Sequence, residues 1–125
     1  MKTRRFISRI EELNRSRKNA HARLVKSGSP VYKKFLELEE AAYAARALDR
    51  KTKLLIGTSV SVVVNCEACM QWHIEEAAAN GATEDELIEA IEIAIKMGGG
   101  PAVVSSRLAL EVMDGVFKAK AGRAS

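Results

Sequence analysis

The stretch that constrains this chain most is Cys66-Glu67-Ala68-Cys69-Met70-Gln71-Trp72-His73, which contains both cysteines and one of the two histidines. Asn65 precedes it, and Asn is a favoured N-cap because its side chain accepts hydrogen bonds from the first turn of a helix. We therefore expect a helix whose first residue is Cys66. A helix turns about 100° per residue, which places Cys66, Cys69 and His73 within about 60° of one another. The positive end of the helix dipole favours a thiolate over a thiol, so this stretch predicts a dithiol redox site.

The length of 125 residues predicts one domain over residues 1–125, large enough to bury a core without disulfide staples. No apolar run approaches the roughly 20 residues that a membrane span needs. The basic N-terminus is not followed by a secretory apolar region and cleavage site, so a cytoplasmic protein is the default expectation. Thiols stay reduced in that compartment, and two close cysteines then indicate redox or metal chemistry rather than a structural staple.

The net charge of +4 is unevenly distributed along the chain. Lysine and arginine dominate residues 1–34, where the acidic residues are Glu11 and Glu12, and the remainder is net acidic. We interpret residues 1–29 as a basic N-terminal helical arm. It is a solvated helix face or an arm that meets an acidic surface of a neighbouring subunit. Nucleic acid is not the expected partner, because no recognition motif accompanies the charge.

Apolar residues that recur at three- and four-residue spacings predict an all-α fold of about six helices. The expected helices cover residues 3–26, 30–46, 50–64, 66–80, the segment between Thr83 and Gly98, and 102–119. The expected core is formed by residues 30–119, and residues 120–125 are expected to be a loose tail. The β-branched run over 54–64 would also suit a buried strand, but its length and the lack of any partner strand favour a helix.

Local signals mark several of these boundaries. Ser29 is the expected N-cap of the second helix, with Pro30 at its first position. Gly81 can take the left-handed position that ends the fourth helix. Thr83-Glu84-Asp85-Glu86 has the pattern of a capping box.

Apolar spacing also predicts which residues of two helices face the core. The expected core positions are Val31, Phe35, Leu38, Ala42 and Ala45 on the second helix, and Val103, Val104, Leu108, Leu110, Val112 and Met113 on the last. So many apolar positions on short helices leave a hydrophobic face uncovered, which predicts a symmetric homo-oligomer.

The order of these motifs resembles the carboxymuconolactone decarboxylase family, and more narrowly its AhpD-type alkylhydroperoxidase branch, over about residues 30–115. The matching segments are Leu48-Asp49-x-Lys51-Thr52-Lys53, Asn65-Cys66-x-x-Cys69-x-x-x-His73, the Gly-x-Thr-x-x-Glu turn, and Gly-Gly-Gly-Pro. The resemblance implies an all-helical AhpD-like fold, a homotrimer or homohexamer, and hydroperoxide reduction by a cysteine pair without metal, haem or flavin. By position it implies that Cys69 is the peroxidatic thiol, Cys66 the resolving thiol and His73 part of the proton relay.

Such a reaction is chemically consistent with the residues themselves. A thiolate that attacks a peroxide becomes a sulfenic acid, and a second thiol one helical turn away condenses with it to a disulfide. The thiolate needs a base, and the leaving alkoxide needs a proton donor, for which His73 is within reach. Another thiol or dithiol must then supply the electrons.

Two positions depart from the branch. Its relay glutamate falls on Leu54 in this chain, and the histidine that it can carry between the cysteines falls on Ala68. Leucine cannot shuttle protons, so another carboxylate substitutes, the peroxidase activity is weak, or the pair exchanges thiols in another way. The candidate carboxylates are Glu37, Glu39 and Glu40, ahead of Glu67, which points about 100° away from Cys66 on the helix.

Four alternatives compete with the peroxidase hypothesis. The cysteines could be plain core residues. Cys66, Cys69 and His73 could bind zinc, with His21 as a fourth ligand if the first helix folds back. The chain could also be a decarboxylase or lactone-type enzyme of the same family, or a non-catalytic oligomeric protein linked to stress. The decarboxylase branch does not rely on the cysteine pair, which disfavours it here.

Overall fold

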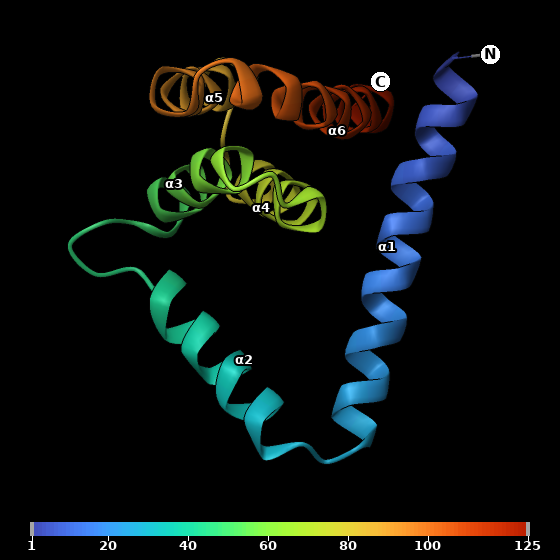
Figure 1. The fold of residues 1–125 in the computed structure, drawn as a ribbon, viewed down its shortest axis with the longest axis vertical. Coiled ribbons are helices and arrows are strands. Elements are labelled where there is room, and N and C mark those ends of the chain that lie inside the picture. The colour runs from blue at the N-terminus through green and yellow to red at the C-terminus, as the bar shows by residue number, and fades with distance from the viewer. Residues whose placement is uncertain (1, 125) are drawn as a thin grey trace. The chain divides into compact units, whose positions relative to one another are not determined.

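The computed structural model describes the backbone of residues 2–124 and the side chains of residues 9–119, 121 and 122. Within this range the chain forms six α-helices and no strand, so the predicted all-α class is confirmed (Figure 1). The helices are α1 (Lys2–Lys26), α2 (Pro30–Tyr43), α3 (Arg50–Val63), α4 (Glu67–Ala79), α5 (Glu84–Gly98) and α6 (Gly100–Ala124). The β-branched run of residues 54–64 is therefore helical through Val63, and none of the described helices is long and apolar enough to cross a membrane.

The chain divides into two compact units, Met1–Asp49 and Arg50–Ser125. The first contains α1 and α2, and the second contains α3 to α6. The organisation expected from the sequence, one domain with a basic arm over residues 1–29, stays a prediction.

In the first unit, the turn between α1 and α2 follows the sequence signals. Gly28 has a φ of 72°, a conformation that glycine adopts without steric cost. The Ser29 hydroxyl accepts a hydrogen bond from the backbone N–H of Tyr32 at 3.1 Å, and Pro30 starts the helix. Both predicted roles are confirmed. Helix α2 ends at Tyr43 rather than at residue 46, because Ala44 adopts an extended conformation.

The predicted core face of α2 is wrong for this unit. No α2 residue is buried, and Val31 and Leu38 are 78% and 65% exposed. Phe35, Ala42 and Ala45 are exposed as well. The physical reason is that α1, the other helix of this unit, is strongly polar and offers little apolar surface against which α2 could pack.

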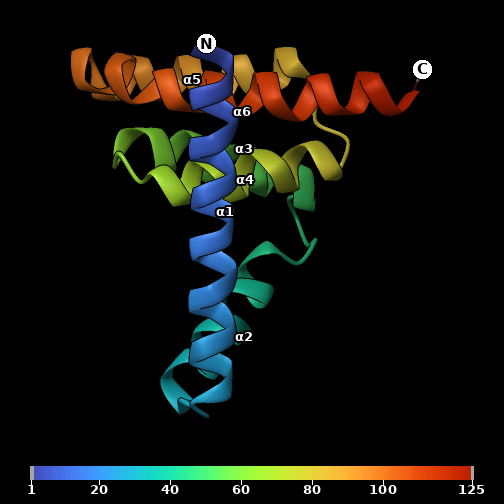
Figure 2. The ribbon, with the colours of Figure 1, turned by 90° about the vertical axis from the view of Figure 1, so that its right-hand side faces the viewer.

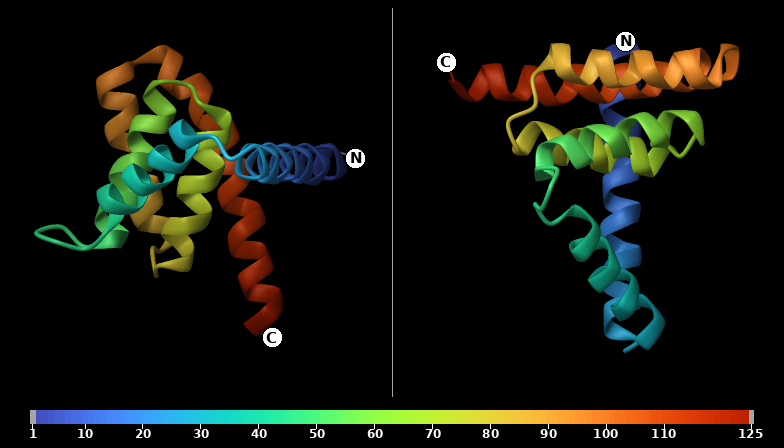
Figure 3. Two further views of the ribbon diagram at one scale, coloured as in Figure 1. Left: turned by 90° about the horizontal axis from the view of Figure 1, so that it is seen from below. Right: turned by 90° about the vertical axis from the view of Figure 1, so that its left-hand side faces the viewer.

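The second unit is built in two layers (Figures 2 and 3). Helices α3 and α4 lie side by side in one layer, and α5 and α6 form the other. Helix α3 also packs on α5, and α6 packs on α4, so the apolar sides of all four helices meet between the layers. The largest fully buried apolar side chains there are Leu54, Val62, Met70, Ile74, Leu87 and Val112.

Helix α6 differs from its prediction at both ends and on its buried face. It begins at Gly100, with Pro101 in the first turn where a missing N–H costs nothing, and it continues to Ala124. The loose tail is therefore wrong for residues 120–124, and residue 125 lies outside the described range.

Half of the buried residues described on α6 are small. Leu108, Val112 and Met113 are buried as predicted, whereas Val103, Val104 and Leu110 are exposed. The other buried positions are Ala102, Ser106 and Ala109, whose four- and three-residue spacing places them on one side of the helix. Small side chains let α6 approach its neighbours closely, and this close packing turns the valines outward.

Glu86 joins two helices of the second unit. The Thr83 hydroxyl accepts the Glu86 N–H at 3.1 Å, and the Thr83 N–H donates to Glu86 Oε1 at 2.9 Å, which confirms the capping box. Lys51 Nζ on α3 contacts Glu86 Oε2 at 2.9 Å. The hydrogen bond from the Thr83 N–H lowers the pKa of the Glu86 carboxyl below its ordinary value of 4.5, and the hydrogen bond from the Lys51 ammonium lowers it further.

Glu86→Gln tests this contribution through pH. A carboxyl whose pKa is lower in the folded chain stabilises it above the ordinary pKa, and this contribution disappears as pH falls through the folded value. We expect Glu86→Gln to lower the unfolding temperature near pH 7 and to match the unmutated chain well below the folded pKa of Glu86. The measurement is thermal unfolding across that range. Glu89→Gln, at an exposed position of α5, is the control and should show no such difference.

Candidate functional site

The candidate site lies at the N-terminus of α4, and the residue that caps this helix is Cys66. Its φ and ψ of −100° and 101° are those of an N-cap, and its Sγ accepts the backbone N–H of Cys69 at 3.2 Å. Helix α4 therefore begins at Glu67, and the prediction that Asn65 is the cap and Cys66 the first helical residue is wrong. Because Cys66 is the N-cap, its sulfur lies directly at the positive end of the helix dipole.

Asn65 ends α3 instead of starting α4. Its φ of 54° makes it the one non-glycine residue with positive φ among the described residues. The Cys66 N–H donates to the Ser61 carbonyl oxygen at 3.0 Å, and the Asn65 N–H donates to that of Val62 at 3.2 Å. This is a Schellman motif, in which a left-handed residue satisfies the last carbonyls of a helix. The Ser105 hydroxyl on α6 donates to Asn65 Oδ1 at 2.9 Å and ties this turn to the other layer.

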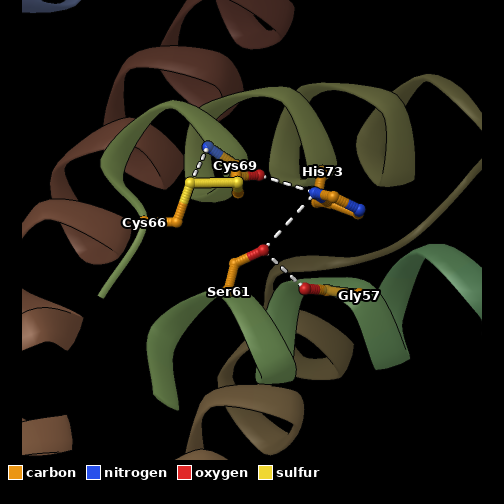
Figure 4. The surroundings of a disulfide bond; sticks show 5 residues. All are labelled: Gly57, Ser61, Cys66, Cys69 and His73. Carbon is orange, nitrogen blue, oxygen red and sulfur yellow. Dashed lines mark hydrogen bonds between the residues drawn. A yellow bond between two sulfur atoms is a disulfide. The ribbon is translucent and has the colours of Figure 1, made fainter. Parts of the chain in front are cut away.

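The two cysteine sulfurs are bonded to each other (Figure 4). The S–S distance is 2.07 Å, and the Cα atoms of Cys66 and Cys69 are 5.1 Å apart, within the usual range for a disulfide. Both residues are half-buried. The proximity expected from the C-x-x-C spacing at a helix start is therefore present, and neither cysteine is an isolated core residue.

His73 lies one helical turn beyond Cys69, as predicted, and it is half-buried. Its Nδ1 is 2.6 Å from the Cys69 carbonyl oxygen and 3.4 Å from Ser61 Oγ. A carbonyl oxygen only accepts, so this contact is a hydrogen bond in the tautomer that has its proton on Nδ1. Figure 4 shows the other ring nitrogen pointing away from the two sulfurs. The Trp72 ring meets the imidazole edge to face, with centroids 4.9 Å apart.

Ser61 was not predicted as a site residue. It lies on α3, is 3% exposed, and its hydroxyl donates to the Gly57 carbonyl oxygen at 2.6 Å. Leu54, Thr58 and Ser61 follow one another at four- and three-residue spacing on the buried face of α3. Leu54 is fully buried in the core, so the position that aligns with the relay glutamate serves packing here. The signal in the sequence for Ser61 was its position seven residues after Leu54, which places both on the same face of the helix and Ser61 nearer to the cysteines.

The carboxylates proposed from the sequence fall in different parts of the chain. Glu37, Glu39 and Glu40 lie on α2 in the first unit, so a role for them stays a prediction. Glu67 is the first residue of α4 and is half-buried.

The zinc alternative finds no ligand set. Over the described part of the chain, no three His, Cys, Asp or Glu side chains gather as metal ligands. His21, the proposed fourth ligand, lies on α1, and its Nδ1 is 2.6 Å from the Tyr32 hydroxyl of the same unit.

Comparison with known proteins identifies the class. Residues 29–112 match the family model of the carboxymuconolactone decarboxylase family, and the chain belongs to that family. An uncharacterized protein encoded in the cox locus of Paracoccus denitrificans is 36% identical over 89 residues, which are 71% of this chain and 80% of that protein.

Two solved structures share the fold. A carboxymuconolactone decarboxylase family protein from Legionella pneumophila is 30% identical, with a TM-score of 0.83 over 86% of this chain and 96% of that one. A family member from Thermotoga maritima, for which a part in the antioxidative response has been suggested, is 27% identical, with a TM-score of 0.82 over 91% of this chain and 97% of that one.

The left-handed turn before the cysteines yields a stability prediction. Asn65→Ala should destabilise the chain by about 1–2 kcal/mol relative to Asn65→Gly, because a Cβ is unfavourable in this conformation and glycine is not. Both variants lose the hydrogen bond from Ser105, so their difference isolates the backbone. The measurement is denaturant unfolding of the two variants, with Ser105→Ala to report the side-chain bond alone. Equal stability of Asn65→Ala and Asn65→Gly would contradict the left-handed assignment.

Proposed function

We propose that this chain is a thiol-dependent oxidoreductase that reduces alkyl hydroperoxides through a dithiol–disulfide cycle of Cys66 and Cys69. The observation that carries the proposal is the pair of bonded sulfurs at the N-terminus of α4, with the His73 imidazole one turn away. Membership of the carboxymuconolactone decarboxylase family and the antioxidative role suggested for the Thermotoga maritima relative support it.

The proposed cycle starts from the two reduced thiols. The Cys69 thiolate attacks the terminal oxygen of the hydroperoxide, the O–O bond breaks, and the alkoxide takes up a proton to become an alcohol. Cys69 is then a sulfenic acid. The Cys66 thiol attacks its sulfur, expels the hydroxyl group as water, and leaves the disulfide. Two electrons have moved from the pair to the peroxide, and an external thiol or dithiol returns them by exchange.

The N-terminus of α4 favours this chemistry. Its free N–H groups and dipole stabilise negative charge on sulfur, and the Cys69 N–H already donates to Cys66 Sγ. In the proposal, His73 takes up the proton released when a thiol ionises and supplies one to the leaving alkoxide. Its Nε2 points away from the sulfurs, so both transfers pass through solvent water. Because Leu54 replaces the relay glutamate, no carboxylate of α3 assists at that position, and we expect peroxide turnover to be slow.

The same proposal includes the assembly and location of the protein. Exposed apolar side chains on α2 and α3, such as Phe35, Leu38, Ile56 and Val60, support a homotrimer or homohexamer in which these faces are covered. The reductant would be a cytoplasmic thiol protein or small dithiol. No metal, haem or flavin takes part in the proposed cycle.

Cysteine variants test the cycle. Reduced protein treated with an alkyl hydroperoxide should lose two hydrogens from the peptide that contains Cys66 and Cys69, as read from intact and peptide mass. Cys66→Ser should stop at a sulfenic acid, with the mass of one added oxygen on Cys69, because the resolving thiol is missing. Cys69→Ser should not react at a comparable rate.

Other outcomes would overturn the proposal. Oxidation of Cys66 in the Cys69→Ser variant at the original rate would reverse the assigned roles. Two intact thiols in the unmutated protein after peroxide treatment would remove the peroxidase function. Turnover of a lactone or carboxylate that survives both substitutions would instead favour the decarboxylase function of the family.

A further inference from the structure

Ser61 on α3 is within hydrogen-bond distance of two residues of the candidate site, Cys66 and His73. Its carbonyl oxygen accepts the N–H of Cys66, the residue that caps α4, at 3.0 Å. Its hydroxyl oxygen lies 3.4 Å from Nδ1 of His73. One buried residue of the neighbouring helix thus contacts the backbone of Cys66. It also contacts the imidazole one turn beyond Cys69, as Figure 4 shows.

We propose that Ser61 is a positioning residue for His73, which it holds with the proton on Nδ1 so that Nε2 is the nitrogen that exchanges protons during turnover. The proposal deepens the dithiol function proposed above and rests on it. In this proposal a serine hydroxyl of α3 orients the His73 ring. The position at which the AhpD-type branch carries its relay glutamate is Leu54 in this chain.

The direction of the hydrogen bonds supports this assignment. A serine hydroxyl has one proton, and that of Ser61 goes to the Gly57 carbonyl oxygen at 2.6 Å. Toward His73 the Ser61 oxygen therefore acts as an acceptor. The second partner of Nδ1, the Cys69 carbonyl oxygen at 2.6 Å, is an acceptor as well. Two acceptors facing one ring nitrogen favour the tautomer in which this nitrogen carries the proton.

The position of Ser61 explains why this residue, rather than another on the same face, meets His73. Thr58 lies one turn earlier, and its hydroxyl donates to the Leu54 carbonyl oxygen at 2.9 Å. The Leu54 side chain is fully buried in the apolar core. Ser61 is the last of the three, close to the turn that leads into Cys66, and it therefore faces the first turns of α4.

The proposed tautomer has a consequence for proton transfer. With the sulfurs bonded, Nδ1 faces the Cys69 carbonyl and Nε2 points away from the disulfide (Figure 4). In this arrangement a proton enters and leaves the imidazole on its far side. Ser61 thus determines which side of the ring is in use, without itself carrying a proton between reacting atoms.

Nitrogen NMR of the oxidised protein tests the proposal directly. At a pH where the ring is neutral, the ¹⁵N shifts of His73 should show the proton on Nδ1. Ser61→Ala removes one acceptor and should reduce the ratio of the Nδ1–H to the Nε2–H form by about two- to fivefold, as expected for loss of a modest hydrogen bond. It should also speed solvent exchange of that proton. Ser61→Thr, which keeps the hydroxyl, should restore both values.

Ser106→Ala is the matched control. Ser106 is 4% exposed, and its hydroxyl donates to the Val103 carbonyl oxygen of its own helix at 2.7 Å. This variant loses the same kind of buried bond on α6 and should leave the His73 spectrum unchanged. Thermal unfolding of both variants separates a tautomer change from general destabilisation.

The outcomes separate this proposal from the function on which it rests. A neutral His73 with its proton on Nε2, or a Ser61→Ala spectrum identical to that of the unmutated chain, would overturn the role of Ser61 even if peroxide oxidises the thiols. Failure of peroxide to oxidise the reduced cysteines would overturn the proposed function while the NMR result still stands. Where both hold, Ser61→Ala should slow thiol oxidation several-fold and Ser106→Ala should not.

Discussion

The turn between α3 and α4 is the feature on which the candidate site depends. A single left-handed residue, Asn65, lets the chain reverse within a few residues, and the N–H of Cys66 closes the turn on the Ser61 carbonyl. Because the turn is this short, the last turn of α3 and the first turn of α4 lie next to each other. This proximity places Ser61 opposite His73 and leaves the sulfur of Cys66 at the positive end of α4. A longer connection would separate the two cysteines from the helix that supports them.

The two-layer packing of the second unit holds this turn in place. Helix α6 lies on α4, and its small buried residues allow the close approach through which Ser105 reaches Asn65. At the other end of α3, Lys51 forms an ion pair with the Glu86 carboxylate at the start of α5. These two polar contacts act at the two ends of α3. The apolar core between them supplies most of the stabilisation.

The proposed proton route differs from the one that the family resemblance implies. A buried leucine stands where a relay carboxylate would be, and α3 meets the imidazole with a hydroxyl instead. A hydroxyl that already donates to a backbone carbonyl orients the ring but cannot store its proton. A carboxylate would both orient the ring and stabilise its positive charge. In the proposed cycle the sulfur chemistry is kept and His73 alone supplies the acid–base chemistry, as expected for a slow peroxidase or a thiol-exchange protein.

The sequence by itself determined the features that depend on neighbouring residues along the chain. The Ser29 cap, the capping box at Thr83, the left-handed Gly81 and the closeness of Cys66 and Cys69 each follow from a few consecutive side chains, and the structure contains all of them. Asn65 was misassigned because Asn suits both a helix N-cap and a left-handed C-terminal position, and local sequence does not distinguish the two. Only the tertiary structure decided the pairing of Ser61 with His73, the outward direction of Val103 and Val104, and the exposure of the apolar face of α2. These features depend on which helices pack together and how closely, and that information is spread over the whole chain.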